Sequence, residues 1–312
     1  MNGSIRLRRG RQTGTSARRR RRMRPSAVAA FGVLFLVSVL WVVPLAWAVD
    51  TSLKPEAQTT SIPPSWTSSR WTIGAYLRVL SNGDLPRWFL NSAVTSAVIT
   101  VGTVVLASLA GYALSRIPFR GRSMVFWLIM AGIMIPVEAL VVPLFYEVNS
   151  LNLVNTYAGI ILPQIASPIA VFIFKQYFDG IPREYEEAAI LDGASRFRVY
   201  WRIWMPLSMP AVATVAILAF IASWNNFLWP LIVITGSNMM TIPVGLASVQ
   251  SSYGIQYAQI MASTILAALP MLVVFAFFQR QIVQGVTGGV KEGQGWSRSS
   301  SAHFFLARCL QR

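Results

Sequence analysis

The sequence has 312 residues, of which 54% are hydrophobic and only 12% are charged, and its formal net charge is +16. Soluble domains usually carry about a quarter charged residues, so this composition excludes an ordinary soluble protein and indicates a membrane-embedded one. The single cysteine (Cys309) and the single histidine (His303) exclude an internal disulfide, a cysteine cluster and a histidine-based triad. We therefore predict no catalytic residue and no metal site.

The first 24 residues form an arginine-rich arm that includes an unbroken run from Arg18 to Arg22. Such a run is compatible with nucleic-acid binding, but no aromatic residue is interleaved with these arginines. An apolar segment follows directly. We therefore predict a cytoplasmic anchor that obeys the positive-inside rule and touches anionic lipid, and no nucleic-acid partner.

Six apolar segments are long enough to cross a bilayer as helices: 27–49, 91–115, 124–144, 157–178, 207–234 and 260–281. The first is too long for the core of a cleaved signal peptide. The second is rich in small residues, which predicts burial in a helix bundle. Prolines inside the spans (Pro136, Pro163, Pro168 and Pro270) indicate either broken helices that line a path or ordinary kinks. The predicted fold class is an all-α polytopic membrane protein with six transmembrane helices.

The loop charges predict the orientation of these spans. The segment 116–122 holds three arginines and no acid, and the tail from Arg280 is basic, whereas the segments 138–156 and 235–259 contain no basic residue. Alternation of these loops places both termini in the cytoplasm. The charged stretch 179–206 then lies on the cytoplasmic side, between the fourth and fifth spans.

The stretch 179–206, which we call the EAA segment, reads as two short helices. Pro182 and the acids that follow it, including Glu187, suit the first turns of a helix. Gly193 suits a left-handed residue at its end, and Ser195 suits the N-cap of a second, basic and aromatic helix. The alternative is an amphipathic loop that lies on lipid, but anionic lipid would repel the acidic helix. A protein partner therefore explains it better.

The spacing in this segment resembles the signature of importer-type ABC permeases. Glu187-Ala188-Ala189 is followed after three residues by Gly193, and Ile203 and Pro206 follow in turn, with Met205 in place of the usual leucine. The stretches 91–101, 223–233, 241–247 and 278–293 resemble the carbohydrate subgroup, of the maltose-permease G type. The resemblance covers about 25–293. It implies that the residues that couple to the ATPase are Glu187, Ala188, Ala189, Asp192, Gly193, Ile203 and Pro206.

The resemblance also implies the function and the partners of the chain, but the arginine-rich arm and the tail 294–312 depart from the family. We expect an arginine-rich arm over 1–24, a permease domain over 25–290 that includes the coupling segment, and a cytoplasmic tail over 291–312. The expected function is half of the translocation path of a sugar importer that works by alternating access in a prokaryotic cell membrane. The expected partners are a second homologous permease subunit, two ATPase subunits and an extracytoplasmic sugar-binding protein.

We expect ATP to be hydrolysed by the ATPase subunit and not by this chain. The sequence holds no G-x-x-x-x-G-K-[ST] loop, and the residues 288–291 (GGVK) do not form one. The chain itself is therefore expected to bind no cofactor, and ATP and Mg are expected on the ATPase subunit.

Two sets of residues are candidates for contact with a sugar or with the protein that delivers it. An indole beside amides suits a sugar, which makes Trp224, Asn225, Asn226 and Trp229 candidates for the substrate path. The alternative is an interfacial tryptophan belt with asparagines that bond across helices. In the resembling family the uncharged loop 235–259 reaches the binding protein, which makes Gly245, Tyr253, Gly254 and Tyr257 candidates there. The alternative is a re-entrant connector.

Other functions remain as alternatives. A permease for glycerol phosphate or another polyol would need an arginine that faces the path, and none is clearly placed. A membrane scaffold would not need the EAA signature. An intramembrane enzyme would need paired acids, a serine–lysine couple or a histidine at matched depth, and the spans offer none.

Overall fold

The computed structural model describes residues 25–61, 63, 65–81, 84–252 and 256–299, and the chain divides into two compact units, Met1–Trp47 and Ala48–Arg312. All regular elements among the described residues are helical, which confirms the all-α prediction. In chain order they are α1 (Pro25–Ser52), α2 (Glu56–Thr59), α3 (Gly74–Ser81), α4 (Leu85–Arg116), α5 (Arg122–Ile133), α6 (Val137–Ser150), α7 (Tyr157–Ile165), α8 (Pro168–Asp179), α9 (Glu184–Leu191), α10 (Arg196–Val199), η1 (Tyr200–Trp204), α11 (Met205–Leu207), α12 (Met209–Trp224), α13 (Leu228–Val233), η2 (Ser237–Met239), α14 (Ile242–Ser252) and α15 (Tyr257–Ser299).

The first unit contains most of α1, which exposes apolar side chains around its circumference. Phe31, Phe35 and Trp41 are all exposed. A helix that is apolar all round needs a lipid or protein environment, so α1 has the surface of a membrane-spanning helix.

Continuous and bent helices both contribute to the predicted spans. The stretches Ala29–Ser52, Leu85–Arg116 and Tyr257–Phe278 are single helices that are long and apolar enough to cross a membrane. Three further helix pairs qualify only together, with bends of 102° between α5 and α6, 45° between α7 and α8, and 78° before α12. Counting each bent pair as one span gives up to six, the predicted number. The third pair, however, joins α12 to residues 196–207, which the sequence assigns mostly to the stretch 179–206 and not to a span.

Three of the predicted spans differ from a single helix. The third, 124–144, is interrupted because α5 ends at Ile133 and α6 begins at Val137, directly after Pro136. The fourth, 157–178, consists of α7 and α8, which are separated by residues 166 and 167. The fifth, 207–234, consists of α12 and α13, which are separated by residues 225–227. A proline cannot donate a backbone hydrogen bond and pushes the preceding residue out of the helical conformation, which explains the interruption at Pro136.

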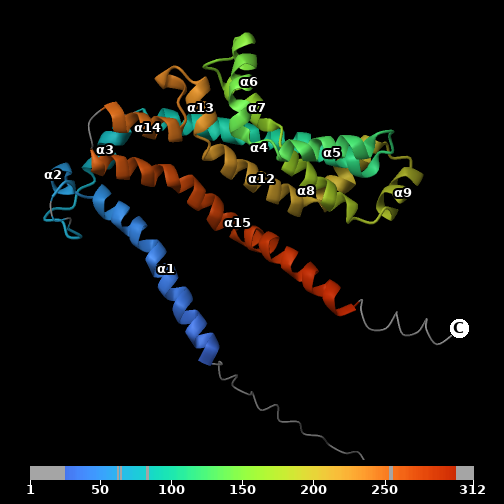
Figure 1. Ribbon diagram of the computed structural model, residues 1–312, viewed down its shortest axis with the longest axis horizontal. Helices are drawn as coiled ribbons and strands as arrows, with labels where there is room; N and C mark the ends of the chain where they lie inside the picture. The colour runs from blue at the N-terminus through green and yellow to red at the C-terminus, as the bar shows by residue number, and fades with distance from the viewer. Residues whose placement is uncertain (1–24, 62, 64, 82–83, 253–255, 300–312) are drawn as a thin grey trace, which may run out of the picture. The chain divides into compact units, whose positions relative to one another are not determined.

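The long helix α4 is the centre of the second unit and packs along α8 and α12 (Figure 1). Its small residues allow this packing, as predicted. A Cβ at Gly111 would lie 2.7 Å from Phe174 Cβ and 3.0 Å from the backbone nitrogen of Lys175. The buried polar residues Ser96 and Ser108 also lie on α4. Their small side chains bring the helices into close contact.

Hydrogen bonds and an ion pair connect the described residues between 50 and 81 to one another and to the start of α15. The Ser52 hydroxyl lies 2.8 Å from the Tyr76 hydroxyl, and Glu56 Oε1 accepts a hydrogen bond of 3.2 Å from the Ala258 backbone N–H. The ammonium of the buried Lys54 pairs with Asp50. These contacts order a segment that has little regular structure of its own.

Candidate functional site

In the EAA segment, α9 ends with the glycine motif that the sequence predicts. Gly193 has a φ of 79°, and its N–H donates to the Ile190 carbonyl at 2.9 Å. The Ala194 N–H donates to the Ala189 carbonyl, also at 2.9 Å. This pair of bonds is a Schellman motif. A Cβ at Gly193 would meet no atom within 4 Å, so glycine is needed there for its backbone conformation and not for space.

The second half of the EAA segment begins at the predicted cap. Ser195 Oγ accepts a hydrogen bond of 3.4 Å from the Arg198 backbone N–H, which satisfies a free donor in the first turn of α10. The helix continues through a π-helical turn, η1, and through α11, which contains Pro206. The chain then bends by 78° into α12. The predicted pair of short helices and the turn after Pro206 are confirmed.

The inner side of the EAA segment rests on an aromatic cluster, which consists of Tyr112, Phe174, Phe178, Tyr200 and Trp204, all buried. The ring centroids of Tyr112 and Tyr200 lie 5.3 Å apart, and Trp204 meets Phe178 edge to face at 5.7 Å. The Tyr200 hydroxyl lies 2.7 Å from Ser108 Oγ of α4. Edge-to-face contacts and a satisfied hydroxyl make this a specific contact between η1, α4 and α8.

Two polar groups at the end of α4 fix the start of the EAA segment. Ser115 Oγ donates to Asp179 Oδ1 at 2.6 Å, and Lys175 Nζ lies 2.6 Å from Asp179 Oδ2. The Arg116 guanidinium lies over the Trp204 ring, 4.1 Å from its centroid. The sequence suggested Arg116 only as a loop charge, and its position at the end of an apolar run was the one available signal.

The predicted coupling residues divide into an exposed and a half-buried group. Ala189 and Ile203 pack against the aromatic cluster. The exposed group comprises Glu187, Ala188, Asp192, Gly193 and Pro206. Near these acids, Leu191 is 88% exposed and Phe197 is 69% exposed. Exposed large apolar side chains beside acids give this face the composition of a protein-binding surface.

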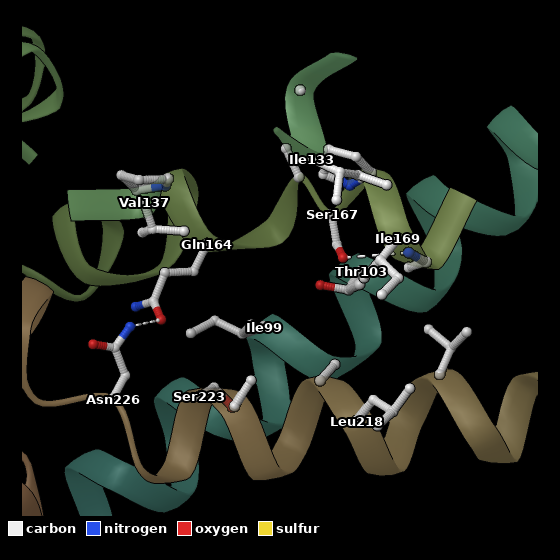
Figure 2. Close-up of a pocket in the computed structure, with 18 of the residues that line it drawn as sticks. Ile99, Thr103, Ile133, Val137, Gln164, Ser167, Ile169, Leu218, Ser223 and Asn226 are labelled. Atoms are coloured by element: carbon white, nitrogen blue, oxygen red, sulfur yellow. Dashed lines mark hydrogen bonds between the residues drawn. The ribbon is translucent and has the colours of Figure 1, made fainter. Parts of the chain in front are cut away.

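A cavity of about 570 Å³ lies where the broken helices meet. Figure 2 shows its walls: Ile99 and Thr103 come from α4, Ile133 and Val137 flank the break between α5 and α6, and Leu218 lies on α12. The α7–α8 break, from Pro163 to Pro168, completes the wall. The interrupted helices thus form a cavity, which favours broken helices over ordinary kinks.

The polar groups of the cavity hold one another in place. Asn226 Nδ2 donates to Gln164 Oε1 at 2.6 Å (Figure 2), and Gln164 Nε2 donates to the Ile160 carbonyl at 2.8 Å. Asn226 Oδ1 accepts from the Trp229 backbone N–H at 3.4 Å. Among the described residues, none that lines the cavity is charged. The cavity is therefore apolar with a few fixed amides and hydroxyls.

Thr103 satisfies a backbone group that the α7–α8 break leaves free. Its hydroxyl donates to the Ile165 carbonyl at 3.1 Å. On the other side of the break, Ser167 Oγ caps α8 by accepting from the Ala170 N–H at 3.4 Å. Both hydroxyls line the cavity, so the residues that stabilise the break also supply its polar surface.

Of the four residues suggested for the substrate path, only Asn226 lines the cavity. Asn225 is exposed and donates to the Ile221 carbonyl of its own helix. Trp224 and Trp229 are buried, and their indole N–H groups donate to the Ala267 and Gly159 carbonyls at 3.3 and 3.0 Å. The two indoles thus bond across helices, whereas the alternative interpretation assigned them to an interfacial belt and the bonds across helices to the asparagines. Three polar residues that line the cavity were not predicted from the sequence: Gln164, Thr103 and Ser167. Gln164 could have been found, because it is a polar residue between two prolines of an apolar run.

The segment 235–247 is not an open loop. It contains η2 and the start of α14, which packs on α4. A Cβ at Gly245 would lie 2.2 Å from the Trp88 ring, so this candidate for the binding-protein loop is packed against α4. Tyr253 and Gly254 lie outside the described residues. Tyr257 is exposed at the start of α15.

Asn91 of α4 holds the segment 235–247 through its side-chain amide. Its Nδ2 donates to the Asn238 and Met240 carbonyls at 3.0 and 2.9 Å, and its Oδ1 accepts from the Tyr157 hydroxyl at 2.6 Å. The Ile242 N–H donates to Ser92 Oγ at 2.8 Å. Side chains of α4 thus bond to main-chain groups of the segment 235–247 that would otherwise lack a partner.

No group of three or more histidine, cysteine, aspartate or glutamate side chains within the described residues could hold a metal ion. The candidate site comprises the cavity, the EAA segment and the segment 235–247.

Comparisons with known proteins agree with this architecture. Residues 103–288 match the family described as binding-protein-dependent transport system inner membrane component. The arabinooligosaccharides transport system permease protein AraQ of Halalkalibacterium halodurans is 39% identical over 259 residues, covering 82% of this chain and 93% of that protein. The sn-glycerol-3-phosphate transport system permease protein UgpE of Yersinia pestis is 36% identical over 268 residues, covering 83% and 94%.

A solved structure has the same fold. A chain of the bacterial ABC transporter involved in the import of the acidic polysaccharide alginate superposes with a TM-score of 0.75 at 20% identity, covering 82% of this chain and 95% of that chain. These matches confirm the resemblance read from the EAA segment. This chain belongs to the binding-protein-dependent transport system inner membrane component family, and it is a transport permease of the ABC importer type, not an enzyme.

Proposed function

We propose that this permease carries a neutral sugar or oligosaccharide and that the cavity beside Gln164 and Asn226 is part of its path. The observation that carries the proposal is the composition of the cavity: apolar walls, fixed amides and hydroxyls, and no charged side chain among the described lining residues. Such a surface suits a molecule with CH faces and hydroxyl groups. Similarity to a permease for arabinooligosaccharides supports the same substrate class.

The proposed assembly contains a second, homologous permease subunit, two ATPase subunits that bind ATP and Mg, and an extracytoplasmic binding protein that delivers the sugar. The family description supports the binding protein. The EAA segment would dock on the ATPase through its exposed acids and through Leu191 and Phe197. In this arrangement both termini, the arm 1–24 and the tail 291–312 are cytoplasmic, and residues 25–290 form the permease domain.

Asn226 and its neighbour Asn225 provide a matched test of the path. Asn226→Ala removes the hydrogen bond to Gln164 and an amide of the cavity, whereas Asn225→Ala removes an exposed amide that does not line it. We expect Asn226→Ala to raise the KM for sugar uptake about fivefold to tenfold, as the loss of one or two hydrogen bonds predicts. Asn225→Ala keeps the wild-type KM.

The measurement is uptake of labelled sugar into proteoliposomes that contain the complete importer. Its substrate is first found by screening the cognate binding protein against neutral oligosaccharides and against sn-glycerol 3-phosphate. Equal KM values in the two variants would contradict the proposal that the cavity is part of the substrate path.

A phosphorylated substrate is the second candidate, since the glycerol-3-phosphate permease of Yersinia pestis is a relative of similar identity. A phosphate group prefers an arginine or lysine partner. The described lining of the cavity contains neither. Preferential binding of sn-glycerol 3-phosphate in the screen would favour this candidate over the sugar.

A further inference from the structure

α4 is attached to two separate segments at its opposite ends. It has 32 residues, which gives a length of about 48 Å at 1.5 Å per residue. Asn91 holds the segment 235–247 near the first residues of α4, and Arg116 is its last residue and holds the EAA segment. One helix therefore connects the two segments that would meet the partners on the two sides of the membrane.

Arg116 forms the joint with the EAA segment. Its Nη2 donates to the Ile181 carbonyl at 2.6 Å and to the Phe178 carbonyl, and its guanidinium lies on the Trp204 ring. Phe178 and Ile181 precede α9, whereas Trp204 follows α10. The Arg116 side chain therefore contacts the chain both before α9 and after α10. A planar guanidinium can stack and bridge two carbonyls at once, which an ammonium cannot.

Asn91 forms the second joint. Its amide makes three hydrogen bonds, two to the main chain of η2 and its C-cap and one to Tyr157 at the start of α7. Asn91 is 2% exposed, so water cannot readily replace these bonds. The Ser92 bond to the Ile242 N–H adds a fourth contact. The segment 235–247 therefore follows any shift of this end of α4.

The helix between the joints is suited to carry a displacement. α4 has no proline beyond its first turn, whereas bends of 45° to 102° interrupt the helix pairs α5–α6, α7–α8 and α11–α12 of the same unit. Close packing on α8 at Gly111 and on Ile165 at Gly102 supports it along its length. A continuous helix moves as one body where a bent pair can flex at its break.

We propose that α4 transmits the displacement of the EAA segment to the segment 235–247, with Arg116 and Asn91 as the positioning residues of its two joints. The proposal rests on the proposed function, because it requires an ATPase that moves the EAA segment. It deepens that function by naming the route through which the ATPase and the binding protein sense each other. Such coupling is reciprocal, so a break at either joint uncouples both directions.

The test uses the complete importer in lipid nanodiscs, with Cys309→Ser and a spin label on Ser237→Cys, an exposed position of η2. The label spectrum is recorded without binding protein, before and after addition of a non-hydrolysable ATP analogue with Mg. We expect the nucleotide to change the label mobility in the parent complex. We expect no change in Arg116→Lys or in Asn91→Asp, which preserve the charge of Arg116 and the acceptor of Asn91 but not the full set of bonds.

Matched controls are Arg120→Lys in the turn after α4 and Asn149→Asp on α6, two exposed side chains, and both keep the response. In the two joint variants, ATPase subunits still co-purify and basal hydrolysis continues, while stimulation by loaded binding protein falls about fivefold or more. A nucleotide response that survives in either joint variant, or is absent in the parent complex, overturns the proposal. Sugar uptake by the parent complex in proteoliposomes reports separately on the proposed function.

Discussion

The EAA segment and the segment 235–247 both rest on α4, but the chemistry of the two contacts differs. The EAA segment uses tilted and edge-to-face rings and one cation over Trp204, together with hydrogen bonds from Ser115, Arg116 and Tyr200. The segment 235–247 uses amides and hydroxyls that bond to main-chain groups. Ring contacts keep much of their energy when they shift slightly, whereas hydrogen bonds weaken steeply with angle. The comparison indicates that a small shift costs less at the ring contacts of the EAA segment than at the hydrogen bonds that hold the segment 235–247.

The largest effect is expected where α4 meets α8. In Gly111→Ala the new Cβ would lie 3.0 Å from the Lys175 backbone nitrogen, so two helices must separate. In Gly245→Ala the overlap is with the Trp88 side chain, which can move at lower cost than a backbone. Overpacking of this kind costs about 1–3 kcal/mol, and we expect Gly111→Ala at the upper end and Gly245→Ala at the lower.

Thermal unfolding of the purified complex in detergent measures both changes. Gly32→Ala, at a glycine with no atom within 4 Å of the added Cβ, serves as the control and should leave the melting temperature unchanged. A greater loss of stability in Gly245→Ala would reverse the ranking of the two contacts.

The next effect separates stability from coupling. Gly193 and Gly121 have nearly equal φ values of 79° and 83°, and a Cβ at either would meet open space. Valine at either position should therefore cost a similar amount, about 1–2 kcal/mol. Only Gly193→Val should abolish uptake and the stimulation of ATP hydrolysis, because Gly193 sets the angle between α9 and α10.

Uptake, stimulated hydrolysis and membrane insertion are measured on the same preparations. Insertion should be normal in both variants. Wild-type uptake in Gly193→Val, or equal losses in the two variants, would refute a specific role for the turn at Gly193.

The smallest effect is expected in the segment 235–247. Asn155, at a φ of 59°, accepts hydrogen bonds from the Thr235 and Gly236 N–H groups at 3.2 and 3.0 Å. Asn155→Ala leaves both donors without this acceptor, but Thr235 is exposed and water can replace the lost partner, so the local cost is about 0.5–1.5 kcal/mol. Hydrogen exchange at residues 235 and 236 should accelerate while exchange in the EAA segment stays unchanged. Asn155→Asp keeps the acceptor and should protect these amides as the wild type does; fast exchange there would contradict this assignment.

The features predicted from sequence are those fixed by near neighbours in the chain. The left-handed turn at Gly193 and the cap at Ser195 depend on residues within five positions, so the local pattern is sufficient. Helical spans follow in the same way from runs of apolar residues. The spacing of residues in the EAA segment carries the family resemblance, and the resemblance added the expectation of an ATPase partner.

The cavity and the joints could not be read from the sequence in this way. Thr103 meets Ile165, and Arg116 meets Phe178, only after α4 packs on the α7–α8 pair. Pro136 predicts an interruption after Ile133, but not the size of the bend, which is 102°. For the same reason Asn225 and Asn226, which are identical and adjacent, could not be told apart before the direction of each side chain was known.

The uncharged lining of the cavity has an electrical consequence. Moving one elementary charge through the membrane potential involves about 2.3 kcal/mol per 100 mV. The proposed neutral sugar carries no such charge, and the described residues that line the cavity add none. The import step is then electrically silent, and its driving force is independent of whether the cell is polarised. Nucleotide hydrolysis alone sets the concentration gradient that the importer can sustain.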